Sequence, residues 1–211
     1  MDIDRIEAQV ERALEHERDT SSFRDLARKV AKAAVGNVEE EQLDEILQFV
    51  TVYVQHVPFF LRQAQTEARR NNIAAFDPIL AAAAWYWGLE DDLFPDHLGL
   101  AGAIDDAYCS LSLLQGLSNH CQSEAGTPLI QPDLTAANKQ MRGFIGEPAA
   151  SELDTFVTEK LEAVTASNSF ADLLQAVSRM GAVTMRDRDP IWGYASSEEI
   201  ANTRLGAMGI F

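Results

Sequence analysis

The sequence feature that most constrains the fold is an apolar pattern with helical periodicity. In the long segment that begins at Glu39, apolar side chains recur three or four residues apart, which places them on one face of a helix. This face holds Leu43, Ile46, Leu47, Val50, Val54 and Val57. The apolar–polar alternation typical of a strand has no useful length anywhere, and Phe49–Val54, the nearest to it, fits the helical face better. The sequence therefore predicts an all-α fold, a compact multi-helix bundle with additional N- and C-terminal helices.

Similar patterns predict helices on both sides of this segment. They cover Asp2–Glu17, Phe23–Val35, Phe59–Arg70, Ile79–Leu89, Ile104–Cys121, Thr135–Phe144, Pro148–Thr165, Ser169–Met180 and Ser196–Leu205. Ser21 and Ser22 are good candidates to cap the second helix, and Pro58 should kink or end the long one. Gly and Pro residues mark 123–134 as a surface loop. We therefore expect N-terminal helices and a helical core in 1–122, and C-terminal helices packed on that core in 135–211.

Composition narrows the possible partners and the compartment. The 211 residues include 33 acidic and 17 basic side chains, a formal charge of −16. Such a charge repels nucleic acid, so we expect no nucleic-acid partner. The longest apolar run, Ile79–Leu89, is too short to span a membrane. Cys109 and Cys121 fall about 18 Å apart along one predicted helix, too far for a disulfide. Free thiols and a charged, amphipathic N-terminus favour the cytoplasm.

The densest group of acidic side chains lies in Glu90–Leu117, a segment that is otherwise apolar. Asp92 and Asp96 belong to a predicted loop, and Asp105 and Asp106 belong to the first turn of the next helix. Burying an unpaired carboxylate is costly, so these groups must be solvated, hydrogen-bonded or paired with a cation. If the loop folds back onto the helix, the four carboxylates can converge on a divalent cation such as Mg²⁺ or Ca²⁺.

Two structural interpretations and a binding one compete at the same residues. Asp105 and Asp106 can cap their own helix and interact with its dipole. Asp92 and Asp96 can form turns around Pro95. The cluster can also contact a partner. No catalytic residue is predicted, because the histidines, cysteines and serines form none of the usual ligand pairs or nucleophile motifs and the glycines form no phosphate loop.

The order of features in Val57–Leu117 resembles a known family. The matching residues are Asp92-Leu93-Phe94-Pro95-Asp96, then Gly102-Ala103-Ile104-Asp105-Asp106. In this order the segment is similar to the YkvA-like domain of unknown function, DUF1232, in which an apolar helix, an acidic Pro-containing loop, a glycine and an Asp-Asp pair precede another apolar helix. The resemblance implies a helical core in this segment. It implies no activity, because no chemistry is established for the family.

Aromatic and charged residues close to the C-terminus form a second unusual segment. Arg186 and Arg188 alternate with acids, and Trp192 and Tyr194 follow after Pro190. Trp, Tyr and Arg are enriched among the residues that dominate protein interfaces, so this stretch is a candidate for binding a partner. The alternative is that Trp192 folds back onto the core of its own chain.

These patterns together favour a binding protein over an enzyme. We expect a non-enzymatic cytoplasmic protein that binds a protein partner or a second copy of itself, for example as an accessory subunit of a multi-protein system. The alternative is a metal-binding protein or metal-dependent enzyme centred on Asp92, Asp96, Asp105 and Asp106. Trp85 and Trp87 add a structural expectation. Side chains two residues apart on a helix point in nearly opposite directions, so one should face the core and the other a neighbouring helix or the acidic loop.

Overall fold

A computed structural model describes residues 2–35, 38–89, 93–131 and 133–184 of the protein. The elements in order are α1 (Ile3–Thr20), α2 (Ser22–Val35), α3 (Glu40–Arg70), α4 (Phe76–Ala83), the 3₁₀ helices η1 (Tyr86–Gly88) and η2 (Asp96–Ala101), α5 (Ala103–Ala125), β1 (Ile130–Gln131), α6 (Thr135–Ile145), α7 (Ala149–Thr165), α8 (Asn168–Met180) and β2 (Val183–Thr184). The fold is all-α, as the sequence predicts. The predicted helix Ser196–Leu205 lies outside the described residues.

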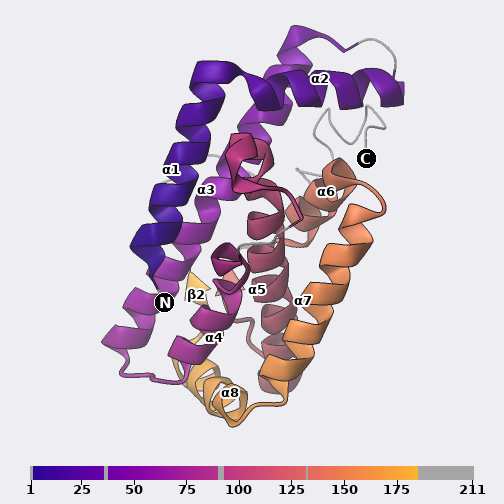
Figure 1. Cartoon of the computed structure of the whole chain (residues 1–211). Coiled ribbons are helices and arrows are strands. Elements are labelled where there is room, and N and C mark those ends of the chain that lie inside the picture. Colours follow the sequence, from indigo (N-terminus) through magenta and orange to yellow (C-terminus); the bar gives the residue numbers. More distant parts are fainter. Residues whose placement is uncertain (1, 36–37, 90–92, 132, 185–211) are drawn as a thin grey trace.

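Helix α5 is the centre of the bundle. It packs against α3, α6, α7 and α8, and its first turns also meet α4 and both 3₁₀ helices. In Figure 1, α1 and α3 run side by side on one flank, α7 lies on the other, and α2 crosses one end. Most of α5 is buried, which explains why its sequence is apolar nearly all round.

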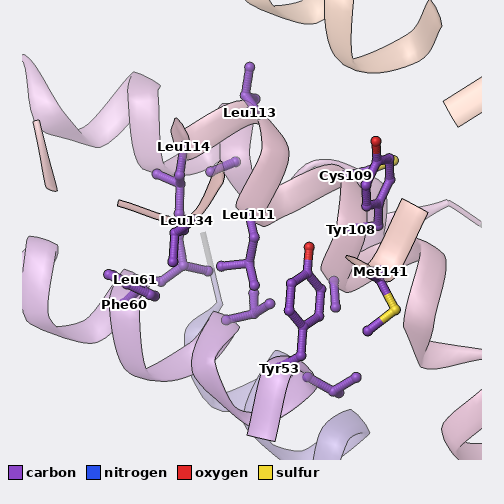
Figure 2. Packing of buried hydrophobic residues seen from close by; sticks show 14 of the residues in the cluster. Tyr53, Phe60, Leu61, Tyr108, Cys109, Leu111, Leu113, Leu114, Leu134 and Met141 are labelled. Carbon is purple, nitrogen blue, oxygen red and sulfur yellow. The ribbon is translucent and has the colours of Figure 1, made fainter. Parts of the chain in front are cut away.

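The core between α3 and α5 is built from the apolar face predicted for α3. Leu43, Ile46 and Val50 are all fully or almost fully buried. Figure 2 shows Tyr53 projecting from α3 toward α5, close to Leu111 and Met141. Its hydroxyl donates a 2.7 Å hydrogen bond to the side-chain oxygen of Asn138 on α6. Burial of this phenol raises the pKa of Tyr53 well above its ordinary value.

Helix α3 differs from the expectation at one residue. Pro58 was expected to kink or end the helix, yet α3 continues as one helix from Glu40 to Arg70 with Pro58 buried inside it. Proline removes one backbone donor, and tertiary packing offsets this loss because its neighbours Val57 and Phe60 are buried in the core. The segments predicted before and after Pro58 are therefore a single helix.

The predicted helix Ile79–Leu89 is also wrong in its extent. Helix α4 runs from Phe76 and stops at Ala83, well before Leu89; the chain then forms the short 3₁₀ turn η1. The expectation for the two tryptophans is nevertheless confirmed. Trp87 is 4% exposed, whereas Trp85 is half-buried with the Lys160 amine of α7 4.6 Å from its ring centre.

Two strands of two residues each were not predicted. β1 and β2 pair in parallel, with Ile130 opposite Val183, and the Val183 amide also donates to the Leu129 carbonyl at 2.9 Å. Strands this short have no readable periodicity. The pairing ties the loop that follows α5 to the chain beyond α8. Within the described ranges, none of the helices combines the length and apolar character needed to cross a membrane.

Candidate functional site

The candidate site is the junction at which the chain enters α5, because two carboxylates are buried there. Asp105 is 0% exposed and Asp106 is 2% exposed. The N-cap of α5 is Gly102, so both acids lie in the first turn and a half of the helix, where its dipole favours negative charge. Because burying an unpaired carboxylate is costly, these two acids need a structural or functional explanation.

Asp105 connects the helix to the loop that precedes it. One of its carboxylate oxygens accepts a 2.9 Å hydrogen bond from the Phe94 amide, and the other accepts from the Asp106 amide at 3.1 Å. The Leu93 amide donates to the Tyr86 hydroxyl at 3.3 Å. Asp105 therefore connects the helix to the loop through the Phe94 amide, and the N-cap position of α5 is held by Gly102.

Aromatic side chains surround the junction. The Trp87 indole donates to the Ser110 hydroxyl at 2.9 Å, and that hydroxyl donates to the Ala83 carbonyl at 2.6 Å. Burial raises the pKa of the Tyr86 phenol, and the negative charge of Asp105 raises it further. Tyr86 therefore stays protonated at any physiological pH and cannot act there as a base.

The thiol of Cys109, one turn further along α5, also has a pKa that its surroundings raise. Burial raises the pKa of the Cys109 thiol, and the charges of Asp105 and Asp106 add to that effect. Burial alone raises the pKa of Cys121 to about 11. Both cysteines are free and buried, so they pack as small apolar side chains and are poor nucleophiles.

The four acids predicted to bind a metal are only partly described. Asp92 lies outside the described residues, and Asp96 begins η2 with a side chain that the structure does not describe. Across the part of the chain that is described, no three His, Cys, Asp or Glu side chains are placed to hold a metal ion. The four-acid site therefore stays a prediction. The partner-binding candidates Arg186, Arg188, Trp192 and Tyr194 also lie outside the described residues.

A cavity of about 290 Å³ lies beside the same junction and was not predicted. The residues that line it come from α1, η1, η2 and the start of α5. They are Gln9, Arg12, Ala13, His16, Trp87, His97, Gly99 and Ala103. The spacing of Arg12 and His16, four residues apart, places both on one face of α1 and was a readable signal. The approach of His97 from η2 was not readable, because it depends on how η2 packs on α1.

A third buried carboxylate, that of Glu17, was also missed. Glu17 is 7% exposed and accepts hydrogen bonds from the first amides of α2, those of Phe23 at 2.7 Å and Arg24 at 3.0 Å. It thus takes the capping role expected of Ser21 or Ser22. Ser21 itself has a left-handed backbone, with φ 54°, where α1 turns into α2.

Comparison with known proteins adds no relative. No protein-family model, no curated protein and no solved structure matches this chain.

Proposed function

We propose that this protein acts by binding a basic protein partner through its acidic surface. The whole chain carries a formal charge of −16. Several positive charges are already paired within the chain. The arginines that form ion pairs with its own carboxylates include Arg24, Arg28, Arg62 and Arg142. A surface of this sign attracts cationic partners and accelerates their association.

The observation that carries the proposal is the outer face of α7. Glu152, Glu159 and Glu162 are exposed and lie on one side of this helix, whose other side packs against α5 (Figure 1). None of the three forms an ion pair with a described residue. Glu159 and Glu162 lie one turn apart, so their like charges repel each other by a few tenths of a kcal/mol. A row of lysines or arginines on a partner would remove that repulsion.

The test compares two variants of equal charge. One variant replaces Glu152, Glu159 and Glu162 with Gln. The control replaces exposed acids on other helices that are likewise without a described ion pair: Glu11→Gln, Asp19→Asn and Glu124→Gln. A partner captured from the source cell and identified by mass spectrometry is then titrated against both variants at low and high salt.

We expect the α7 variant to bind this partner about tenfold more weakly than the wild type, from three exposed charges worth a few tenths of a kcal/mol each. The control variant should bind within about twofold, and high salt should remove most of the difference. Equal losses in both variants would reduce the proposal to a general charge effect. Unchanged binding in the α7 variant would contradict it.

The aromatic C-terminal stretch is proposed as a second contact, with a partner or with another copy of the chain. Replacing Trp192 and Tyr194 with Ala should weaken association and leave the melting temperature within a few degrees. Arg186 and Arg188 belong to the same proposed contact. Sedimentation of the wild type alone distinguishes self-association from binding to a different protein. If the variant fails to fold and the wild type never associates, the two rings belong to the core of the chain.

The alternative function is metal binding by Asp92, Asp96, Asp105 and Asp106. Two neighbouring carboxylates buried at one helix start favour it, because carboxylate oxygens are the ligands that Mg²⁺ and Ca²⁺ prefer. Mg²⁺, Ca²⁺ or Mn²⁺ should then raise the melting temperature by mass action. Asp105→Asn with Asp106→Asn should abolish the rise, while the control Glu17→Gln should keep it. No rise with any of the three ions would reject this alternative.

We also propose that Val57–Leu117 is related to the YkvA-like domain, in a protein that works in the cytoplasm. The relation is supported by the order of elements: the end of α3, α4, the Pro95 loop, Gly102, and the Asp pair at the start of α5. An experimental structure of a YkvA-like protein would test the relation. Superposition of its Asp-Asp helix and preceding loop on α5 and residues 93–102 is expected. A different path of the loop would contradict it.

A further inference from the structure

We propose that the cavity beside the start of α5 binds a phosphate group, either free or carried by a small metabolite. This inference is independent of the proposed protein partner, because it rests on different residues and predicts a small-molecule ligand. The cavity has a volume of about 290 Å³. That is close to the low end of the range for ligand sites, which suits one phosphate with a small organic part.

The charge of the lining is the first observation. In a chain with twice as many acids as bases, no described residue that lines this cavity is acidic. Arg12, His16 and His97 instead bring a guanidinium and two imidazoles to it. Glu15, on the same helix, is not part of the lining and lies 3.9 Å from Arg18. Among the described residues, the lining is therefore a local exception to the acidic composition of the chain.

Arg12 is the second observation. It forms no ion pair with any described residue, unlike the arginines that α2, α3 and α6 direct at neighbouring carboxylates. Its guanidinium offers donors in a planar fork that matches two oxygens of a phosphate. An arginine with no ion pair among the described residues, in a lining whose described residues include no acid, is the group that a phosphate would pair with first.

The backbone at Gly99 brings the two cavity histidines close to each other. Gly99 has a left-handed backbone, with φ 64°, and a Cβ atom there would lie only 2.8 Å from Cγ of His16. The missing side chain thus lets the His16 ring pack directly on η2, two residues from His97. Ala103, the first residue of α5, also lines the cavity, and Asp105 and Asp106 already occupy the positive end of this helix.

Gln9 and Trp87 complete the lining. The side-chain oxygen of Gln9 is buried without a hydrogen-bond partner among the described residues. A monohydrogen phosphate carries an O–H that can donate to this oxygen, whereas chloride carries none. Trp87 already donates its indole N–H to Ser110, so toward the cavity it offers only its ring surface. This surface suits a small apolar part of the ligand.

The test titrates inorganic phosphate and glycerol phosphate into the full chain, with sodium chloride at matched ionic strength as the reference. Calorimetry gives the affinity, and NMR follows the imidazole signals of His16 and His97, with His120 as the ring that should not respond. The variant is Arg12→Gln. Arg5→Gln is the matched control, because Arg5 lies on the same helix, is exposed, does not line the cavity and forms no described ion pair.

We expect one or both phosphates to bind the wild type and to shift both cavity histidines. Arg12→Gln should weaken binding by about tenfold or more, the usual effect of losing one charge-assisted contact, and Arg5→Gln should change it by less than about twofold. Tighter binding of glycerol phosphate identifies a metabolite as the source, and tighter binding of inorganic phosphate identifies the free ion. Equal effects of the two arginine variants, or no binding beyond the chloride reference, would overturn the proposal.

Discussion

Two turns of this molecule are each stabilised by a buried carboxylate together with a buried aromatic ring. The two carboxylates reach along the chain in opposite directions. At the α1–α2 turn, Glu17 reaches forward and accepts from the first amides of the helix that follows it. At the start of α5, Asp105 reaches backward and accepts from the loop that precedes its helix. Phe23 packs against Phe144 of α6 at the first turn, and Trp87 bonds to Ser110 at the second.

The difference shows what each carboxylate stabilises. Glu17 satisfies two orphan amides of a helix end, and 7% of its surface stays exposed. Asp105 is completely buried and orders a loop against the centre of the bundle, so water cannot easily take its place. We therefore expect the α5 junction to depend more strongly on its side chains than the α1–α2 turn.

The largest effect is expected at Trp87. Trp87→Ala removes a buried ring and leaves Ser110 without one of its partners, and it should lower the free energy of unfolding by about 3–5 kcal/mol. Trp85→Ala is the matched control. Because Trp85 is only half-buried beside Lys160, it should cost about 1 kcal/mol. Urea unfolding followed by circular dichroism measures both costs. Equal costs would show that Trp87 does not stabilise the fold more than Trp85 does.

Asp105 should come next. Asp105→Ala leaves the Phe94 amide without its acceptor and should cost about 2–3 kcal/mol in urea unfolding. Asp105→Asn keeps one acceptor oxygen and should cost less. Hydrogen exchange at the Phe94 amide gives a second readout, since it should accelerate in the Ala variant. A cost below that of Glu17→Ala would reverse the comparison.

Glu17 should show a smaller effect than Asp105. Glu17→Ala removes the acceptor of the Phe23 and Arg24 amides and should cost about 1–2 kcal/mol, the usual range for a helix cap. Glu17→Gln, which keeps one acceptor, should recover about half of this loss. A Ser22→Ala control should change stability by only a few tenths of a kcal/mol, because its hydroxyl lies 3.4 Å from Glu17. Equal losses from Glu17→Ala and Ser22→Ala would contradict the capping role.

Titration of Cys121 has no effect at neutral pH, and its effect appears only above about pH 9. Its pKa is about 11 in the folded protein against 9.0 for an ordinary thiol, so between these values the unfolded state binds fewer protons than the folded state. The stabilisation is complete below pH 9 and is lost as the pH rises toward 11, by at most about 1.4 kcal/mol per pH unit. Cys121→Ala should flatten this part of the stability curve relative to the wild type. Identical slopes would contradict the expectation.

Much of the helical architecture could be predicted because it follows from local periodicity. The pattern in α6, α7 and α8 placed each helix within a residue of its observed limits. The errors at Pro58 and after Ala83 have the same origin: each depends on packing outside the local window. Pro58 is tolerated because its neighbours are buried, and the chain leaves the helical path after Ala83 so that Trp87 can reach Ser110.

The candidate site was predictable only in part. The density of acids singled out Asp105 and Asp106, because so many carboxylates in an apolar segment need an explanation. Glu17 gave no such signal, since it is one acid among several on an amphipathic helix. Arg12 and His16 shared a visible helical face, but nothing in the sequence placed His97 beside them.

The sequence by itself determined the all-α class, the apolar faces that form the core, and the excess of negative charge, because each is a property of local order or of composition. Only the tertiary structure decided which carboxylates are buried and which amides they accept from. It also decided that His97 of η2 lines one cavity together with Arg12 and His16 of α1. Such meetings between distant residues depend on how helices pack, and helix packing is set by the whole core rather than by any one segment.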